Sequence, residues 1–451
     1  MKITFLGATQ QVTGSKYLLE ENNVKMLVDC GLFQGQHEET KHNFDTFPIE
    51  PHTISAVVLT HAHIDHTGYA PALIKKGFKG KVYCSQATYE LCKILLKDTA
   101  TIEEEDAKKA NESGHLKVPA LPLYTVKDVE TALTFFQVIA YDTPFKVGNF
   151  QIKLIQSGHI LGSNFVVVSD GKETLTFSGD LGRPNQMIMK SPPHLKQTDY
   201  LVLESTYGAE LHGQGDPTQE LGEIINGAIA QHGVLIIPSF AVGRTQTILY
   251  CLYQLKQKKV IPDLPIYLDS PMAISVTDLL CIFPDEHKLS PDLCRDVCHV
   301  AQYVRTVQES KMIGRTHGPA IIIAGSGMAD GGRVLHHFAH YISDAKNTIL
   351  FVGFCAPGTN GRTLIDGAKT ITIHDKSYEV NATIKNIDIF SAHADYNEIL
   401  EWLSSFATAP KKVFLTHGEL ASSQSLQKKI EERFGWSVII PKYLESFDLN
   451  G

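Results

Sequence analysis

Short apolar runs bounded by Gly and Asn turns fill the first third of the chain, and they predict strands. They lie at residues 2–6, 16–19, 25–29 and 56–60, and similar runs follow at 151–156, 165–169, 174–178 and 200–203. Helical patterns at 67–76 and 85–96 separate the two groups. The first two hundred residues therefore predict a strand-rich domain with a few helices.

The pattern changes after Glu204. Continuous apolar runs at 233–238, 265–268 and 320–324 alternate with helical segments that begin near Arg244 and Arg333. This alternation is typical of a mostly parallel sheet covered on both faces. Strand-rich sequence returns at 370–374, 378–384 and 412–416. We therefore predict an α/β protein in which a domain at 207–361 is inserted into another, formed by residues 1–206 and 362–451.

Composition narrows the class of protein. Of 451 residues, 43% are hydrophobic and 20% charged, which excludes a disordered chain. No apolar run approaches the roughly 18 residues of a membrane helix, and the first residues form a strand pattern rather than a leader. The eight cysteines contain no CxxC pair, so we expect reduced thiols in the cytoplasm. Cys294 and Cys298 stand one helical turn apart, a spacing that does not establish a site by itself.

The formal net charge of −8 excludes a protein whose whole surface is positively charged for binding nucleic acid. It does not exclude a local positively charged groove.

The strongest chemical signal is the run His61-Ala62-His63-Ile64-Asp65-His66, between a predicted strand and a predicted helix. In extended backbone His61 and His63 point the same way and can share one metal ion. Asp65 and His66 lie where the chain turns and can face a second ion. Imidazole and carboxylate together suit Zn²⁺.

Three further candidates each follow an apolar or β-branched run and stand beside a glycine: His159, Asp180 and His417. Each alone could be an ordinary loop residue, but together they complete two ligand sets. We assign His61, His63 and His159 to one ion and Asp65, His66 and His417 to the other, with Asp180 bridging both. Asp29, at the end of a strand, is a candidate hydrogen-bond acceptor for a ligand histidine.

Two zinc ions outweigh the charges of Asp65, Asp180 and a hydroxide, so the centre would be positive within an acidic chain. Such a pair of ions suits in-line displacement at phosphorus, although some amidases use the same device.

With these motifs the sequence resembles the metallo-β-lactamase superfamily, whose signature is HxHxDH, and within it the β-CASP branch of RNA-processing nucleases. Asp29, the His61–His66 run, His159 and Asp180 fit the superfamily motifs. Glu204, His393 and His417 fit the β-CASP motifs. The resemblance implies an αββα sandwich with an inserted β-CASP domain. Asp180 and His417 stand more than half the chain length apart, which leaves room for that insert.

The resemblance also implies chemistry. Asp65, Asp180, His393 and Glu204 would be catalytic, with His393 contacting the scissile phosphate, protonating the leaving oxygen and pairing with Glu204. Histidine at position 417 goes with RNA rather than DNA in this family. The implied protein is a cytoplasmic di-zinc ribonuclease, endonucleolytic, of the short bacterial and archaeal type similar to the mRNA 3′-end cleavage endonuclease. Single-stranded RNA would enter a cleft between the two domains.

Two loops in the predicted insert are candidates for contacts with substrate phosphate, because each joins a strand to a helix and exposes backbone N–H groups. The first contains Ser239 and Arg244, and the second contains Ser326, Gly327 and Arg333. Neither contains GK[ST], so an ATP-hydrolysing P-loop is not indicated. Both could instead be plain turns.

Two other functions stay open at this point. The same ligands permit a di-metal hydrolase of a small ester, thioester or phosphodiester, and some relatives are non-catalytic RNA-binding scaffolds. The sequence leaves the oligomeric state open, a homodimer included.

Overall fold

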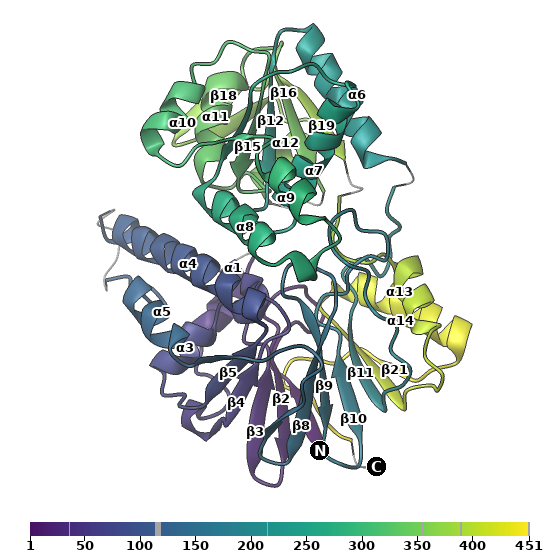
Figure 1. Ribbon diagram of the computed structural model, residues 1–451. Helices are drawn as coiled ribbons and strands as arrows, with labels where there is room; N and C mark the ends of the chain where they lie inside the picture. Colours follow the sequence, from purple (N-terminus) through teal and green to yellow (C-terminus); the bar gives the residue numbers. More distant parts are fainter. Residues whose placement is uncertain are drawn as a thin grey trace. The chain divides into compact units, whose positions relative to one another are not determined.

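A computed structural model describes residues 1–35, 37–112, 119–213, 215–353, 355–356, 358–387 and 390–449. The chain forms two compact units (Figure 1). Met1–Leu211 and His393–Gly451 make the first, and His212–Ala392 make the second. One unit is thus interrupted by the other along the sequence.

Two seven-stranded sheets form the first unit. The order in one is β22 (Ser446–Asp448), β1 (Lys2–Phe5), β2 (Tyr17–Glu21), β3 (Val24–Val28), β4 (Ala56–Val58), β5 (Lys81–Cys84) and β6 (Phe136–Val138). The order in the other is β21 (Val438–Ile439), β20 (Lys412–Thr416), β11 (Tyr200–Glu204), β10 (Thr174–Phe177), β9 (Asn164–Ser169), β8 (Phe150–Gln156) and β7 (Phe145–Val147).

The two sheets pack face to face because alternate residues along their strands are apolar. One buried cluster joins Ile3, Phe5 and Met26 of the first sheet to Phe177 and Phe414 of the second. Each large side chain buried in this way contributes about 1.5–3 kcal/mol. The rings of Phe5 and Phe414 lie 5.3 Å apart between centroids.

Helices accompany both sheets of this sandwich. On the side of β3, β4 and β5 lie α3 (Ala70–Lys75), α4 (Gln86–Glu112) and α5 (Val126–Leu133) (Figure 1), and the short helix α2 (Ile64–Thr67) precedes α3 along the chain. A second buried cluster joins β11 and β20 to α13 (Tyr396–Leu403) and α14 (Leu420–Phe434). Short helical turns occur at α1 (His37–Thr40), η1 (Lys41–Asn43) and η2 (Pro51–Thr53). The unit is the expected αββα sandwich.

The second unit is built on a six-stranded sheet in which every strand pair is parallel. Its order is β14 (Gln302–Tyr303), β13 (Ile266–Asp269), β15 (Ala320–Gly325), β12 (Val234–Ser239), β16 (Thr348–Val352) and β19 (Thr383–Ile387). The central strands β12, β15 and β16 are almost wholly buried, which agrees with their unbroken apolar sequences. The predicted parallel sheet is confirmed.

Helices and one hairpin complete the second unit. The helices are α6 (Pro217–Ala230), α7 (Arg244–Gln257), α8 (Pro271–Ile282), α9 (Pro291–Cys298), α10 (Val307–Ile313), α11 (Arg333–Tyr341) and α12 (Asn360–Ile365), with a 3-10 turn at η3 (Pro284–Glu286). The hairpin pairs β17 (Thr370–Ile373) with β18 (Lys376–Glu379).

The inserted unit ends at Ala392, whereas the sequence predicted that it would end at residue 361. The segment 378–384, predicted as one strand, contains the end of β18 and the start of β19, with a break at Asn381. β19 pairs with β16 of the inserted sheet, so the chain does not return to the sandwich until it leaves this strand. The local hydrophobic pattern could not reveal this pairing, because the strands of both units have similar patterns.

Among the helices that the structure describes, none combines the length and the apolar character needed to cross a membrane.

Candidate metal centre

The candidate ligands gather because the strands before them are parallel. Strands β10, β11 and β20 are neighbours that run the same way, so Asp180, Glu204 and His417 emerge at one edge. In the other sheet β3 and β4 are also parallel, and they end close to Asp29 and His61. Parallel strands bring the residues after their carboxyl ends together.

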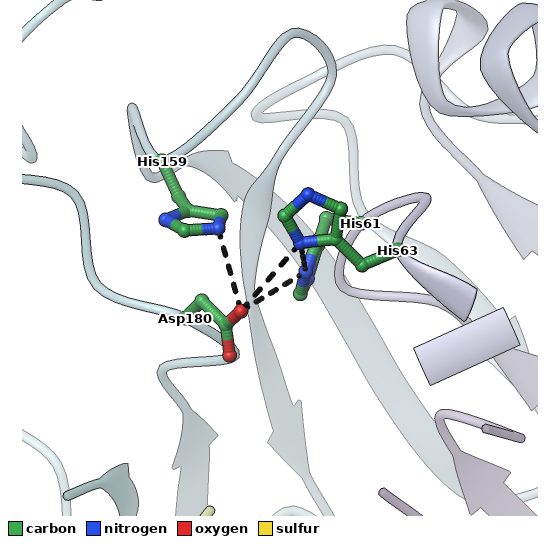
Figure 2. Close-up of side chains that lie close together, drawn as sticks. All are labelled: His61, His63, His159 and Asp180. Carbon is green, nitrogen blue, oxygen red and sulfur yellow. Dashed lines mark hydrogen bonds and ion pairs between the residues drawn. The ribbon is translucent and has the colours of Figure 1, made fainter. Parts of the chain in front are cut away.

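Three histidines surround one oxygen of Asp180 (Figure 2). The Oδ2 atom lies 3.2 Å from His61 Nε2, 3.8 Å from His63 Nδ1 and 3.4 Å from His159 Nε2. His61 Nε2 and His63 Nδ1 are 3.0 Å apart. The ligand atoms of these four residues all lie within 4.8 Å of one another. They form the first set predicted from the sequence.

The second predicted set surrounds the other oxygen of Asp180. Its Oδ1 atom lies 3.2 Å from His66 Nε2 and 3.6 Å from His417 Nε2. Asp65 Oδ2 lies 3.0 Å from His417 Nε2 and 3.9 Å from His66 Nε2. Asp180 is thus shared by both sets, one oxygen to each.

A cation fits this arrangement. Asp180 is 2% exposed, and its buried Oδ1 has no hydrogen-bond partner among the described residues, although imidazole nitrogens lie close by. An unpartnered carboxylate oxygen inside a protein is costly. Two sets of imidazole and carboxylate ligands that share such an oxygen have the donor chemistry of a paired zinc site.

Burial and charge prepare the ligands for metal binding. Burial lowers the pKa of His61 to about 3, with His66 adding to the effect, and burial holds the pKa of His159 well below its usual range. Both rings are therefore neutral, the form that binds a metal. Burial opposes ionisation of Asp180, but the charges of His417 and His66 overcome it and hold the Asp180 pKa well below its ordinary value.

His66 shows how much negative charge the centre holds. Burial disfavours its imidazolium, yet Asp180, Asp29 and Asp65 together raise its pKa well above the ordinary value. Three carboxylates around one buried ring need positive charge, which a metal ion would provide in place of the proton.

The second nitrogen of three ligand rings is held by a hydrogen bond. His66 Nδ1 donates to Asp29 Oδ2 at 2.7 Å. His61 Nδ1 lies 3.1 Å from Thr60 Oγ1, whose hydroxyl donates to Asp29 Oδ2 at 2.8 Å. His417 Nδ1 lies 3.0 Å from Thr206 Oγ1. Each contact leaves Nε2 facing the centre.

Asp29 was expected from the sequence to touch a ligand histidine, whereas Thr60 and Thr206 were missed. Thr60 directly precedes His61, and a hydroxyl beside a ligand at a strand end is the signal that could have identified it. Thr206 lies 211 residues from His417 along the chain, so only the fold reveals its contact.

Glycine is required next to His159. Gly158 has a φ of +72°, and a Cβ atom there would lie 2.0 Å from the carbonyl oxygen of Lys190. No side chain fits at that distance, and the left-handed conformation favours glycine as well.

His393 and Glu204 meet beside the two sets. Nδ1 of His393 lies 3.1 Å from both carboxylate oxygens of Glu204, and its Nε2 lies 4.0 Å from Asp180 Oδ2. Backbone pairing with Gly182 fixes the segment that carries His393. Burial disfavours the charged ring, but Glu204 and Asp180 outweigh it and raise the His393 pKa to about 9.

The five residues of the predicted phosphate loops lie in the second unit. The Ser239 side chain is buried and accepts a hydrogen bond from Thr245 Oγ1, and Ser326 Oγ accepts one from the backbone N–H of Asp330. The guanidinium of Arg244 lies close to Gly353, and the ring of Phe240 lies close to Gly327: a Cβ atom on either glycine would clash with that side chain.

Arg333, the fifth of these residues, donates to Asp269 Oδ1 at 2.6 Å and to the carbonyl oxygens of Val304 and Arg305. These contacts give Arg333 a structural role inside its unit that does not depend on a phosphate. The predicted phosphate contacts of all five residues remain predictions.

The sequence is similar to three described families. Residues 11–218 match the metallo-beta-lactamase superfamily, 245–364 match the Beta-Casp domain, and 377–441 match the Zn-dependent metallo-hydrolase RNA specificity domain. The three matches follow one another along the chain in the order predicted for a sandwich with a β-CASP insert.

Curated relatives cover most of the chain. Ribonuclease TTHA0252 of Thermus thermophilus is 34% identical, over 99% of each chain. Transcription termination factor FttA of Methanosarcina mazei is 30% identical over 96% of this chain and 70% of its own length, and that of Methanocaldococcus jannaschii is 27% identical over 99% and 71%. A solved structure from Enterococcus faecalis, titled a protein of unknown function, shares the fold with a TM-score of 0.55 at 13% identity, over 99% of each chain.

Proposed function

Because this chain belongs to the β-CASP branch of the metallo-β-lactamase superfamily, we propose that it is a metal-dependent ribonuclease that hydrolyses RNA phosphodiester bonds. One observation carries the proposal: one oxygen of the buried Asp180 faces His61, His63 and His159, and the other faces the separate pair His66 and His417. The name of the Thermus relative supports RNA as the substrate.

We propose that the centre holds two zinc ions. His61, His63 and His159 would hold one, and Asp65, His66 and His417 would hold the other, with Asp180 between them. When bound, the pair of ions supplies a Lewis acid for a phosphoryl oxygen and a hydroxide nucleophile at neutral pH. Thr60, Thr206 and Asp29 orient the rings, so that little reorganisation accompanies binding.

His393 is the proposed proton donor to the leaving oxygen. Both oxygens of Glu204 accept the hydrogen bond from Nδ1. The proton to be transferred is therefore the one on Nε2, which lies on the side of Asp180. Glu204 has its own support, because it accepts a hydrogen bond from the backbone N–H of Leu181 at 2.6 Å. Glu204 therefore acts as a positioning residue that fixes the ring and favours its charged form.

The proposed mode is endonucleolytic, and circular RNA tests it directly because it has no end for an exonuclease. The purified protein, loaded with zinc, should linearise a labelled circular RNA and should stop when a chelator is added. Products with 5′-phosphate and 3′-hydroxyl ends would agree with hydrolysis by an attacking hydroxide. Cleavage of linear RNA alone would contradict the endonucleolytic part of the proposal.

Variants distinguish RNA cleavage by this protein from cleavage by a contaminating ribonuclease. Asp180→Ala should abolish cleavage and lower the zinc content, because it removes an oxygen from each set. His52→Asn is the control. It changes a histidine that belongs to neither ligand set and whose side chain is 64% exposed, so it should leave cleavage intact. If varied linear and circular RNAs stay uncut by the zinc-loaded protein while a small thioester or phosphodiester is hydrolysed, the chain is a small-molecule hydrolase. RNA binding by a protein that holds no zinc and hydrolyses nothing would instead identify an RNA-binding scaffold.

A further inference from the structure

A second cluster of metal-ligand side chains lies in the inserted unit. Cys281 stands near the end of α8, and Cys294 and Cys298 stand one turn apart on α9. The Sγ atom of Cys281 is 3.0 Å from that of Cys294 and 3.0 Å from that of Cys298. All three sulfur atoms lie within 4.8 Å of one another. None of these residues belongs to the centre described above.

We propose that Cys281, Cys294 and Cys298 bind a single soft metal cation, zinc, which joins α8 to α9. Three sulfur atoms each about 2.3 Å from one tetrahedral ion lie about 3.8 Å apart, between the 3.0 Å separations from Cys281 and the 4.8 Å limit that encloses all three atoms. Thiolate ligands select zinc over hard cations such as Mg²⁺ and Ca²⁺. A disulfide could use only two of the three sulfurs and needs a bond of about 2.05 Å, well below the observed separations.

The surroundings hold the sulfur atoms in place. Cys294 and Cys298 are 2% and 6% exposed, while Cys281 is the exposed member of the cluster. Cys298 Sγ lies 3.6 Å from the carbonyl oxygen of Thr277, which is buried one turn before Cys281 on α8. Three thiolates leave one position of a tetrahedral ion for a further ligand, and the exposed Cys281 gives solvent access to the cluster.

His287 supports Cys294 from the segment between the two helices. It is 3% exposed, its Nε2 donates to the carbonyl oxygen of Leu280 at 2.8 Å, and its Nδ1 accepts from the backbone N–H of Leu289. The His287 ring also lies beside Cys294. The cluster therefore combines convergent sulfur atoms with a buried polar side chain between the two helices.

An ion at this position would have a structural consequence. The segment between α8 and α9 contains only the short turn η3 as regular structure. A metal ion held from both helices would fix the ends of this segment, and the binding free energy would add to the stability of the inserted unit.

Cobalt substitution tests the proposal with a readout that is independent of RNA cleavage. The full-length protein, stripped of metal under reducing conditions, is titrated with Co²⁺ and followed by absorption. A thiolate-to-cobalt charge-transfer band in the near ultraviolet should appear and saturate by three equivalents, one for the cysteine cluster and two for the centre around Asp180. The other centre contains no cysteine, so cobalt bound there does not produce this band.

Cys281→Ser is the test variant, because the side chain is exposed and the substitution leaves the core of the unit intact. It should lose the band and lower the zinc content of the protein as purified by one ion per chain. Cys251→Ser, a buried cysteine on α7 whose sulfur accepts from Thr218 Oγ1, is the matched control and should keep both.

Three results would overturn the proposal: no band in the wild-type protein, a band that survives Cys281→Ser, or a disulfide among the three cysteines in mass spectra of unreduced protein. Failure of the proposed ribonuclease activity would be seen separately, as uncut RNA in a protein that still shows the cobalt band.

Discussion

Glu204 holds His393 through both of its carboxylate oxygens, each 3.1 Å from Nδ1. The glutamate is buried at the end of β11, whereas the histidine comes from the segment before α13, 189 residues later. This pairing orients a ring whose other nitrogen lies 4.0 Å from Asp180.

The first prediction concerns proton transfer by this ring. His393→Ala should lower kcat for RNA by about 10²–10⁴-fold, the range that general acid catalysis contributes. The same variant should hydrolyse bis(4-nitrophenyl) phosphate at close to the wild-type rate, because nitrophenolate leaves without a proton. Steady-state kinetics on both substrates check this. An equal loss on both would show that His393 serves binding or folding instead.

Glu204 should act only through His393. Glu204→Gln keeps a hydrogen-bond acceptor but loses the charge, so kcat for RNA should fall while KM changes little. The double variant with His393→Ala should be no slower than His393→Ala alone. Additive losses would contradict a shared role.

Thr206 is predicted to tune metal affinity. Its hydroxyl lies 3.0 Å from both the Nδ1 and the carbonyl oxygen of His417, so it fixes the ring with Nε2 toward the centre. Thr206→Val should weaken zinc binding by about 10–100-fold, the usual effect of losing such a contact. Thr206→Ser retains the hydroxyl and should restore affinity. Competition with a zinc chelator of known affinity measures the difference, and equal affinities in all three proteins would refute it.

Gly158 and Gly171 offer a matched pair for the steric argument. Both have a positive φ, +72° and +90°, but a Cβ atom at Gly158 would meet a backbone oxygen at 2.0 Å, whereas one at Gly171 meets nothing within 4 Å. Gly171→Ala should therefore lower the free energy of unfolding by about 1–2 kcal/mol, through strain alone. Gly158→Ala should lower it further and also weaken zinc binding, because His159 must move. Chemical denaturation of both variants checks this, and equal losses would contradict it.

Lys16 should make stability depend on pH. Its buried ammonium lies 4.1 Å from the ring centre of Phe33, and burial lowers its pKa from 10.5 to about 8. Between these values the unfolded chain binds more protons than the folded one, so the contribution of Lys16 to stability rises with pH. From pH 7 to pH 10 the free energy of unfolding of wild type, relative to Lys16→Met, should rise by about 2–3 kcal/mol. Urea denaturation at several pH values measures this difference, and a flat difference would show that Lys16 titrates normally.

Local patterning was sufficient for the parallel inserted sheet and for grouping the seven candidate ligands. It was less accurate for element bounds: the helix predicted at 67–76 is two short helices, α2 and α3, and the one predicted at 85–96 extends to Glu112. Strand periodicity and the run from His61 to His66 depend on neighbours in sequence, and such signals survive without a fold. The second boundary of the insert was not predictable in this way, because the partner of β19 is β16 and pairing between strands is a tertiary property. Resemblance to a family supplied Glu204 and His393, which local sequence alone would have left as routine residues.

The sequence by itself determined which side chains could bind a metal, since residue type and the ends of apolar strands are written in it. Only the tertiary structure decided which hydroxyl contacts which ring and which cysteines converge. Thr206 contacts His417 from 211 residues away, and Cys281 contacts Cys294 and Cys298 from 13 and 17 residues away, because the segments that carry them pack side by side. Hydrogen bonds and metal coordination act over a few ångströms, and packing alone sets distances of that size between segments far apart in the chain.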